Sequence, residues 1–226
     1  MAAHELAHQW WGNYVRPATY HDTSLSESLA EFTSCLYTEK VIESRRQIVV
    51  NNLNYVYKVT QKEDRPLGSS SVHNSPRYVE IMYHKGSVVM DMLRIELGEQ
   101  KWLDTLKAFA KKFGRDYARW QDLAKTVDEE TGEDYGWYFK QWFAGMGYVR
   151  GEIAVEIKKV GTESVVRMRF AHLGTQKMRF RLPIRVRFVD GTLENTYLDI
   201  LPQADTHRSI SERTFSQEVV SVRPDI

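Results

Sequence analysis

The sequence has little or nothing of several features that would assign it to a particular class of protein. It holds one cysteine among 226 residues, Cys35, which excludes an internal disulfide framework and a zinc knuckle built from several cysteines. Its net charge is only +1, so it lacks the concentrated basic surface that nucleic-acid binding needs. No apolar run approaches the roughly 20 residues that span a bilayer, and no signal-peptide pattern is visible. The sequence therefore predicts neither a nucleic-acid partner nor a membrane span, and it leaves the compartment open.

What the sequence does have is a division into two halves. All six tryptophans precede Met146, and apolar residues in that half recur at helical spacing. From Val149 onward, apolar and charged residues alternate as they do in strands. We therefore predict an α+β protein, with a helical domain over residues 1–147 and a small β-sandwich over residues 148–226.

Capping and turn residues set the limits of the expected elements. Ser24 or Ser26 is placed to cap a helix that runs to about Ser44. The other expected helices cover residues 2–14, 45–61, 76–98, 101–113, 120–131 and 135–143. In the second half, Asp190-Gly191 between two alternating segments predicts a β-hairpin, and the alternation predicts six or seven short strands.

The clearest chemical pattern is an HExxH motif, His4-Glu5-Leu6-Ala7-His8. On a helix this spacing places both imidazoles on one face, where they can bind one Zn²⁺ ion. Glu5 lies beside them and is placed to take a proton from the attacking water. The alternative is a coincidental polar run, which would occur in about one chain in a hundred of this length.

A catalytic zinc site needs a third protein ligand, and the next predicted helix offers two carboxylates. Glu27 stands 19 residues after His8, and an antiparallel helix pair can bring it opposite the two histidines. Glu31 lies one turn later and competes for the same role on spacing alone. Glu27 can also be an exposed carboxylate at a helix start, which is a common position for Glu.

These residues carry a resemblance to a known family. The segment His4–Asn13, followed by Glu27, resembles the aminopeptidase N and leukotriene-hydrolase family of zinc peptidases. The similarity continues at Tyr78, in Tyr83–Val89, which is similar to the family's Y-x-K-G segment, and in Trp137–Trp142. The resemblance thus covers essentially the whole chain, because the C-terminal strands resemble the small β-domain that follows in many members.

The resemblance implies a fold, an activity and a set of site residues. It implies the helical half of a thermolysin-like zinc peptidase domain, with one Zn²⁺ held by His4, His8 and Glu27. It also implies that Glu5 acts as general base and proton shuttle, and that Tyr83 donates a hydrogen bond to the developing oxyanion. The implied reaction is hydrolysis of the N-terminal residue from a peptide substrate.

Two departures from the family pattern affect these expectations. Around Glu27 the family usually has W-L-N-E-G, whereas this chain has Ser24-Leu25-Ser26-Glu27-Ser28. The family's exopeptidase motif, which holds the free amine of the substrate, precedes HExxH and is not found here. We therefore expect this chain to be a fragment with weak or no activity alone. A non-catalytic zinc-binding interaction module and an endopeptidase of the same zinc class remain the alternatives, and the oligomeric state stays open.

Other reactive or charged residues receive plainer interpretations. Cys35 is expected to be a small apolar helix residue. Arg77 and Lys85 flank the helix that carries Tyr83, and solvated charges are their default interpretation.

Overall fold

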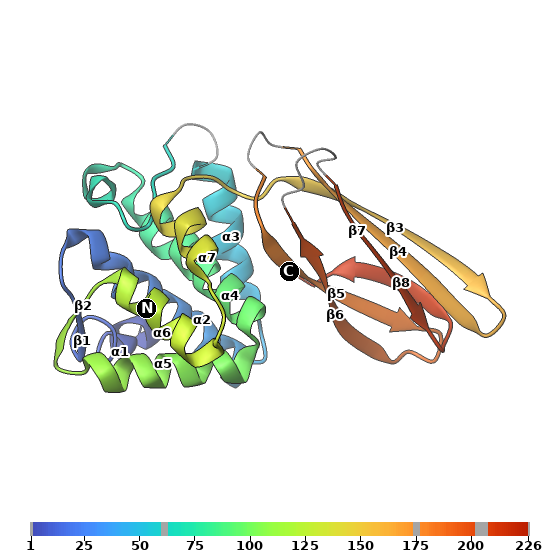
Figure 1. Cartoon of the computed structure of the whole chain (residues 1–226), viewed down its shortest axis with the longest axis horizontal. Helices are drawn as coiled ribbons and strands as arrows, with labels where there is room; N and C mark the ends of the chain where they lie inside the picture. The colour runs from blue at the N-terminus through green and yellow to red at the C-terminus, as the bar shows by residue number, and fades with distance from the viewer. Residues whose placement is uncertain (1, 60–62, 174–176, 202–207, 226) are drawn as a thin grey trace. The chain divides into compact units, whose positions relative to one another are not determined.

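The computed structural model describes residues 2–59, 63–173, 177–201 and 208–225. The chain divides into two compact units, Met1–Gly147 and Tyr148–Ile226. Figure 1 shows that helices dominate the first unit and that strands make up the second, which confirms the predicted α+β class. None of the described helices is both long enough and apolar enough to cross a membrane.

The first unit consists mainly of helices around an apolar core. Its α-helices are α1 (Ala2–Ala7), α2 (Glu27–Val41), α3 (Arg46–Val59), α4 (Gly86–Leu97), α5 (Glu99–Phe113), α6 (Trp120–Thr131) and α7 (Gly136–Phe139). Among the described residues, two 3-10 helices (Tyr20–Leu25 and Ser70–Asn74) and one π-helix (Glu80–Lys85) lie between them, and a second π-helix (Lys140–Ala144) follows α7. Residues 60 and 61 of the predicted third helix lie outside the described residues.

The first helix is shorter than predicted. It ends at Ala7, and the backbone N–H groups of the following turn donate to carbonyls five residues earlier, from Asn13 to His8 and from Val15 to Trp10. The chain then enters strand β1 (Val15–Pro17), which pairs in parallel with β2 (Asp116–Ala118). The sequence does not predict this pairing, because three-residue strands are too short to show a periodic pattern.

The helix predicted after Pro76 begins at Tyr78, contains a π-helical segment, Glu80–Lys85, and continues as α4. Hydrogen bonds in a π-helix span five residues instead of four, so its side chains are rotated relative to those of a regular helix. Such segments occur frequently at functional sites. Tyr83 lies within this one.

Lys85 ends the π-helix, and the prediction that it is a solvated charge is wrong. Its side chain is fully buried, and its ammonium group donates to both carboxylate oxygens of Asp64 at 2.7 and 2.9 Å. Asp64 also accepts from the backbone N–H of Gly147 at 2.6 Å. Burial lowers the pKa of Lys85, and the Asp64 charge opposes that shift. The ion pair therefore ties the π-helix to the end of the helical unit.

The second unit contains two three-stranded antiparallel sheets. One has the order β3 (Gly151–Val160), β4 (Glu163–His172), β7 (Arg208–Phe215), and the other β6 (Leu193–Ile200), β5 (Phe180–Phe188), β8 (Val219–Pro224). Alternate residues of β4 and β5 are buried, and the rings of Phe170 and Phe180 join the two sheets at 5.4 Å. The described part of this unit thus has six strands, and the predicted hairpin at Asp190-Gly191 joins β5 to β6.

Candidate metal centre

The structure brings His4, His8 and Glu27 together at the start of the helical unit. His4 lies on α1, His8 lies in the turn directly after it, and Glu27 is the first residue of α2. The Nε2 atoms of both histidines are 3.6 Å from Oε2 of Glu27. One ligand atom from each residue lies within 4.8 Å of the others, so the three side chains converge on one point.

The geometry of this cluster fits a zinc ion. Oε2 of Glu27 is buried and has no hydrogen-bond partner among the described residues, although an isolated carboxylate oxygen in such a place costs free energy. In a tetrahedral zinc site with bonds of about 2.1 Å, neighbouring ligand atoms are about 3.4 Å apart. The two separations of 3.6 Å are close to that value. The donor set of two imidazoles and a carboxylate is also one that catalytic zinc uses.

The outward-facing nitrogens of both histidines have partners of their own. Nδ1 of His4 is 2.9 Å from Oε2 of Glu31, and Nδ1 of His8 is 2.9 Å from the carbonyl oxygen of Trp11. Such contacts orient a ligating imidazole and select its tautomer. The Glu31 carboxylate thus contacts the far side of the His4 ring, whereas Glu27 lies with the Nε2 atoms. Sequence spacing alone did not separate these two roles.

Two of the three serines around Glu27 make hydrogen-bond contacts, whereas the buried hydroxyl of Ser24 has no hydrogen-bond partner among the described residues. Ser26 occupies the cap position of α2 without making the predicted side-chain cap, because its Oγ lies 3.3 Å from Nδ1 of His8. Ser28 is buried and donates to the carbonyl oxygen of Met82 at 2.7 Å. Gly86 makes room for it, since a Cβ at that position would lie 2.0 Å from Oγ of Ser28. Ser28 therefore packs α2 against the π-helix and α4, whereas Ser26 contacts the His8 side chain.

Tyr83 lies against the cluster from the π-helix. Its ring stacks on that of His4, with centroids 5.2 Å apart and an interplanar angle of 11°. Burial, followed by a hydrogen bond to the Glu27 carboxylate, raises the pKa of Tyr83, so the hydroxyl stays protonated at neutral pH. Tyr78 is 6.2 Å from the Tyr83 ring, and burial and the Glu27 charge raise its pKa too.

Glu5 is exposed, unlike the three converging residues. It lies on α1 next to His4, and its negative charge contributes to the raised pKa of Tyr83, which places the two groups within electrostatic range. A carboxylate that is open to solvent and adjacent to the cluster can exchange protons with water. The arrangement therefore places an exposed carboxylate and a hydroxyl group beside three side chains whose spacing allows them to hold a metal ion.

Comparisons with known proteins point to one family. The model of the peptidase family M1 domain matches residues 1–142. A leucyl aminopeptidase of Saccharolobus solfataricus is 27% identical over 241 residues, covering 100% of this chain and 28% of the relative. The chain thus spans little more than a quarter of the length of that curated relative.

Two solved structures are similar in fold. Aminopeptidase A of Legionella pneumophila, in complex with aspartic acid, has a TM-score of 0.65 at 14% identity, covering 98% of this chain and 24% of that one. A mutant M1 zinc metallopeptidase from Deinococcus radiodurans, bound to a Tyr-Ser-Ala substrate, has a TM-score of 0.57 at 23% identity. That match covers 66% of this chain and 33% of the other.

Proposed function

The chain belongs to peptidase family M1, and from this premise we propose that it is a zinc-dependent metallopeptidase of the aminopeptidase type, with His4, His8 and Glu27 as the zinc ligands. The observation that carries the proposal is the buried, unpartnered Oε2 of Glu27, which lies 3.6 Å from the Nε2 atoms of both histidines. The proposed reaction is hydrolysis of the N-terminal residue from a peptide, in line with the names of the relatives.

Each residue of the site has a distinct task in this proposal. Zinc, when bound, acts as a Lewis acid and lowers the pKa of water to about 7. Glu5 takes a proton from the attacking water and passes it to the leaving amine. Tyr83 donates a hydrogen bond to the oxyanion as negative charge develops there. The raised pKa of Tyr83 suits this task, because only the protonated hydroxyl can donate.

Metal analysis tests the ligand set. We expect about one zinc per chain in protein purified without chelator, as three-ligand sites of this kind bind one ion. His4→Ala and His8→Ala should each lose the zinc, whereas His21→Ala, at an exposed histidine whose Nδ1 contacts the carbonyl oxygen of Gly68, should keep it. Zinc-free wild-type protein, or zinc retained in the His4 and His8 variants, would overturn the assignment.

Hydrolysis of amino-acid arylamides then separates catalysis from metal binding. Glu5→Gln should retain zinc and lower the rate by about 10²- to 10⁴-fold, the usual contribution of a general base. Tyr83→Phe should also retain zinc and lose about 10²- to 10³-fold. We propose that this chain, which covers 28% of the leucyl aminopeptidase, has weak or no activity alone, so these rates are best compared in a longer protein that includes the segments preceding this region in that relative. A longer, zinc-loaded protein that hydrolyses no peptide would support the interaction module instead. Cleavage of N-terminally blocked peptides in preference to free ones would support the endopeptidase.

A further inference from the structure

Asn51, in the middle of α3, has a fully buried side chain. It is connected to the metal centre through one residue, Glu31. Its Nδ2 donates to Oε1 of Glu31 at 2.8 Å and to Oγ of Ser87 at 3.1 Å. Its Oδ1 accepts from Gln47 at 3.1 Å, and Sγ of Cys35 lies 3.5 Å from Nδ2. A buried amide with this many partners has one orientation available to it.

Glu31 is held on both sides by these contacts. One carboxylate oxygen lies 2.9 Å from Nδ1 of His4, and the other accepts from Asn51. The terminal torsion of a glutamate is broad, so a carboxylate with one contact can rotate away from its partner. The Asn51 amide restricts that rotation. A carboxylate held beside Nδ1 of His4 favours the tautomer in which Nδ1 donates, and this tautomer leaves the lone pair of Nε2 for a metal ion.

The second histidine has no comparable arrangement of side chains. Nδ1 of His8 lies 2.9 Å from the backbone carbonyl of Trp11, which the local chain path holds in place, and Oγ of Ser26 is 3.3 Å away. The orientation of His4 therefore depends on a relay of side chains from α2 and α3, whereas that of His8 depends mainly on nearby backbone. A change at Asn51 should therefore act on His4 before it acts on His8.

We propose that Asn51 is a positioning residue for the metal centre, which sets the zinc affinity by fixing Glu31 against His4. The inference rests on the proposed zinc site, but it concerns a residue that does not itself contact the ligand cluster. Outer partners of metal ligands change metal affinity by about 10- to 100-fold when they are mutated. Because Asn51 acts through Glu31, its effect should be at the lower end of that range, about tenfold.

Zinc affinity, measured by competition with a chelating dye, tests this relay. We expect Asn51→Leu and Asn51→Ala each to weaken binding by about tenfold, and Glu31→Gln by more than that. Asn51→Ala removes the donor without adding a larger side chain or a charge beside Glu31, so it covers the case in which the leucine variant does not fold. Ser87→Ala is the matched control, because it removes a buried partner of Asn51 and leaves Glu31 untouched; it should stay within about twofold of wild type.

Two further readouts separate positioning from general loss of stability. The visible absorption of the Co²⁺-substituted protein should shift in the Asn51 variants and remain unchanged in Ser87→Ala. In a Glu31→Gln background, Asn51→Leu should cause little additional loss of zinc affinity, because the two residues act in series. Unchanged affinity and Co²⁺ spectra in the Asn51 variants, or effects that add fully to those of Glu31→Gln, would overturn the inference while the zinc site stands. Absence of zinc binding by the wild-type chain would instead overturn the proposed function, and the inference with it.

Discussion

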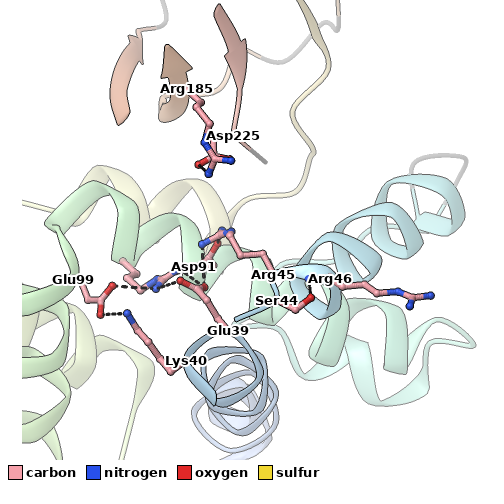
Figure 2. A network of polar contacts seen from close by, with 10 residues as sticks. Glu39, Lys40, Ser44, Arg45, Arg46, Asp91, Glu99, Arg185 and Asp225 are labelled. Carbon is pink, nitrogen blue, oxygen red and sulfur yellow. Dashed lines mark hydrogen bonds and ion pairs between the residues drawn. The ribbon is translucent and has the colours of Figure 1, made fainter. Parts of the chain in front are cut away.

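The helical unit contains two polar networks, one at each end of α2, and they differ in charge balance. The metal network consists of His4, His8, Glu27, Glu31 and Asn51. The ion-pair network consists of Glu39, Lys40, Arg45, Asp91, Arg94 and Glu99. Figure 2 shows Glu39, Asp91 and Arg45 of the second network facing one another between α2 and α4.

In the ion-pair network three acidic side chains match three basic ones. Arg94 is only 5% exposed and pairs with Asp91 at 2.8 Å and with Glu39 at 2.9 Å. Arg45 joins the same two carboxylates at 2.7 and 3.0 Å. In the metal network, by contrast, Glu27 and Glu31 pair with no Lys or Arg among the residues that the structure describes. The first network is neutral as it stands, whereas the second has an excess of negative charge that suits a bound cation.

The largest expected effect comes from removing the Glu27 carboxylate, whose buried Oε2 has no hydrogen-bond partner among the described residues. Glu27→Ala should weaken zinc binding by at least about 10³-fold, or about 4 kcal/mol, because one of three protein ligands is lost. The free energy of unfolding of the metal-free protein should stay within about 1 kcal/mol of wild type or rise, since a buried acceptor without a partner is removed. Zinc titration and urea unfolding measure the two quantities. If the metal-free Glu27→Ala protein were destabilised as strongly as a variant of the ion-pair network, the proposed difference between the two networks would be wrong.

The reverse pattern is expected in the ion-pair network. Asp91→Ala should lower the free energy of unfolding by about 3 kcal/mol, because it leaves the buried Arg94 without a main partner. Zinc affinity should stay within about twofold of wild type, because among the described residues Asp91 pairs with Arg45 and Arg94 and with none of the ligand cluster. The same titration and unfolding measurements apply. A tenfold loss of zinc affinity would show that the two networks are coupled along α2.

A change in packing should act on the metal end of α2. Gly86→Ala would place a Cβ 2.0 Å from Oγ of Ser28, the residue next to Glu27. This clash should lower the free energy of unfolding by about 2 kcal/mol, and it should also weaken zinc binding. Adding Ser28→Gly removes the two closest atoms and should restore both quantities to those of Ser28→Gly alone. Unfolding and zinc titration of the three variants form the test, and failure of the double variant to recover would contradict the steric explanation.

The smallest effect concerns the exposed edge of the ion-pair network. A hydrogen bond from Lys40 lowers the pKa of Glu99, so the pair stabilises the fold above the unfolded pKa of 4.5 and loses this contribution as pH falls through the folded pKa. Because the Glu99 side chain is 44% exposed, Glu99→Gln should cost at most about 0.5 kcal/mol at pH 7. The difference should shrink as the pH falls below 4.5, as urea unfolding of the metal-free protein at pH 7 and at successively lower pH values can show. A difference that grows toward low pH would contradict this sign.

Local patterns predicted much of the fold and part of the site. The spacing of His4 and His8 is a property of one helical turn, so it could be recognised without a structure, and the Asp190-Gly191 hairpin is equally local. Glu27 and Glu31 are one turn apart on α2, and only the packing of α1 against α2 separates them. Lys85 was misjudged for the same reason, because its partner Asp64 lies in a distant loop.

The sequence by itself determined the donor types and the family, since HExxH, the later glutamate and Tyr83 follow one another in a recognisable order. The tertiary structure decided what these groups face. It set Oε2 of Glu27 between two imidazoles, Glu31 behind His4, and Asn51 behind Glu31. The physical reason is that ligand chemistry belongs to each side chain, whereas distances between residues on different helices depend on how those helices pack.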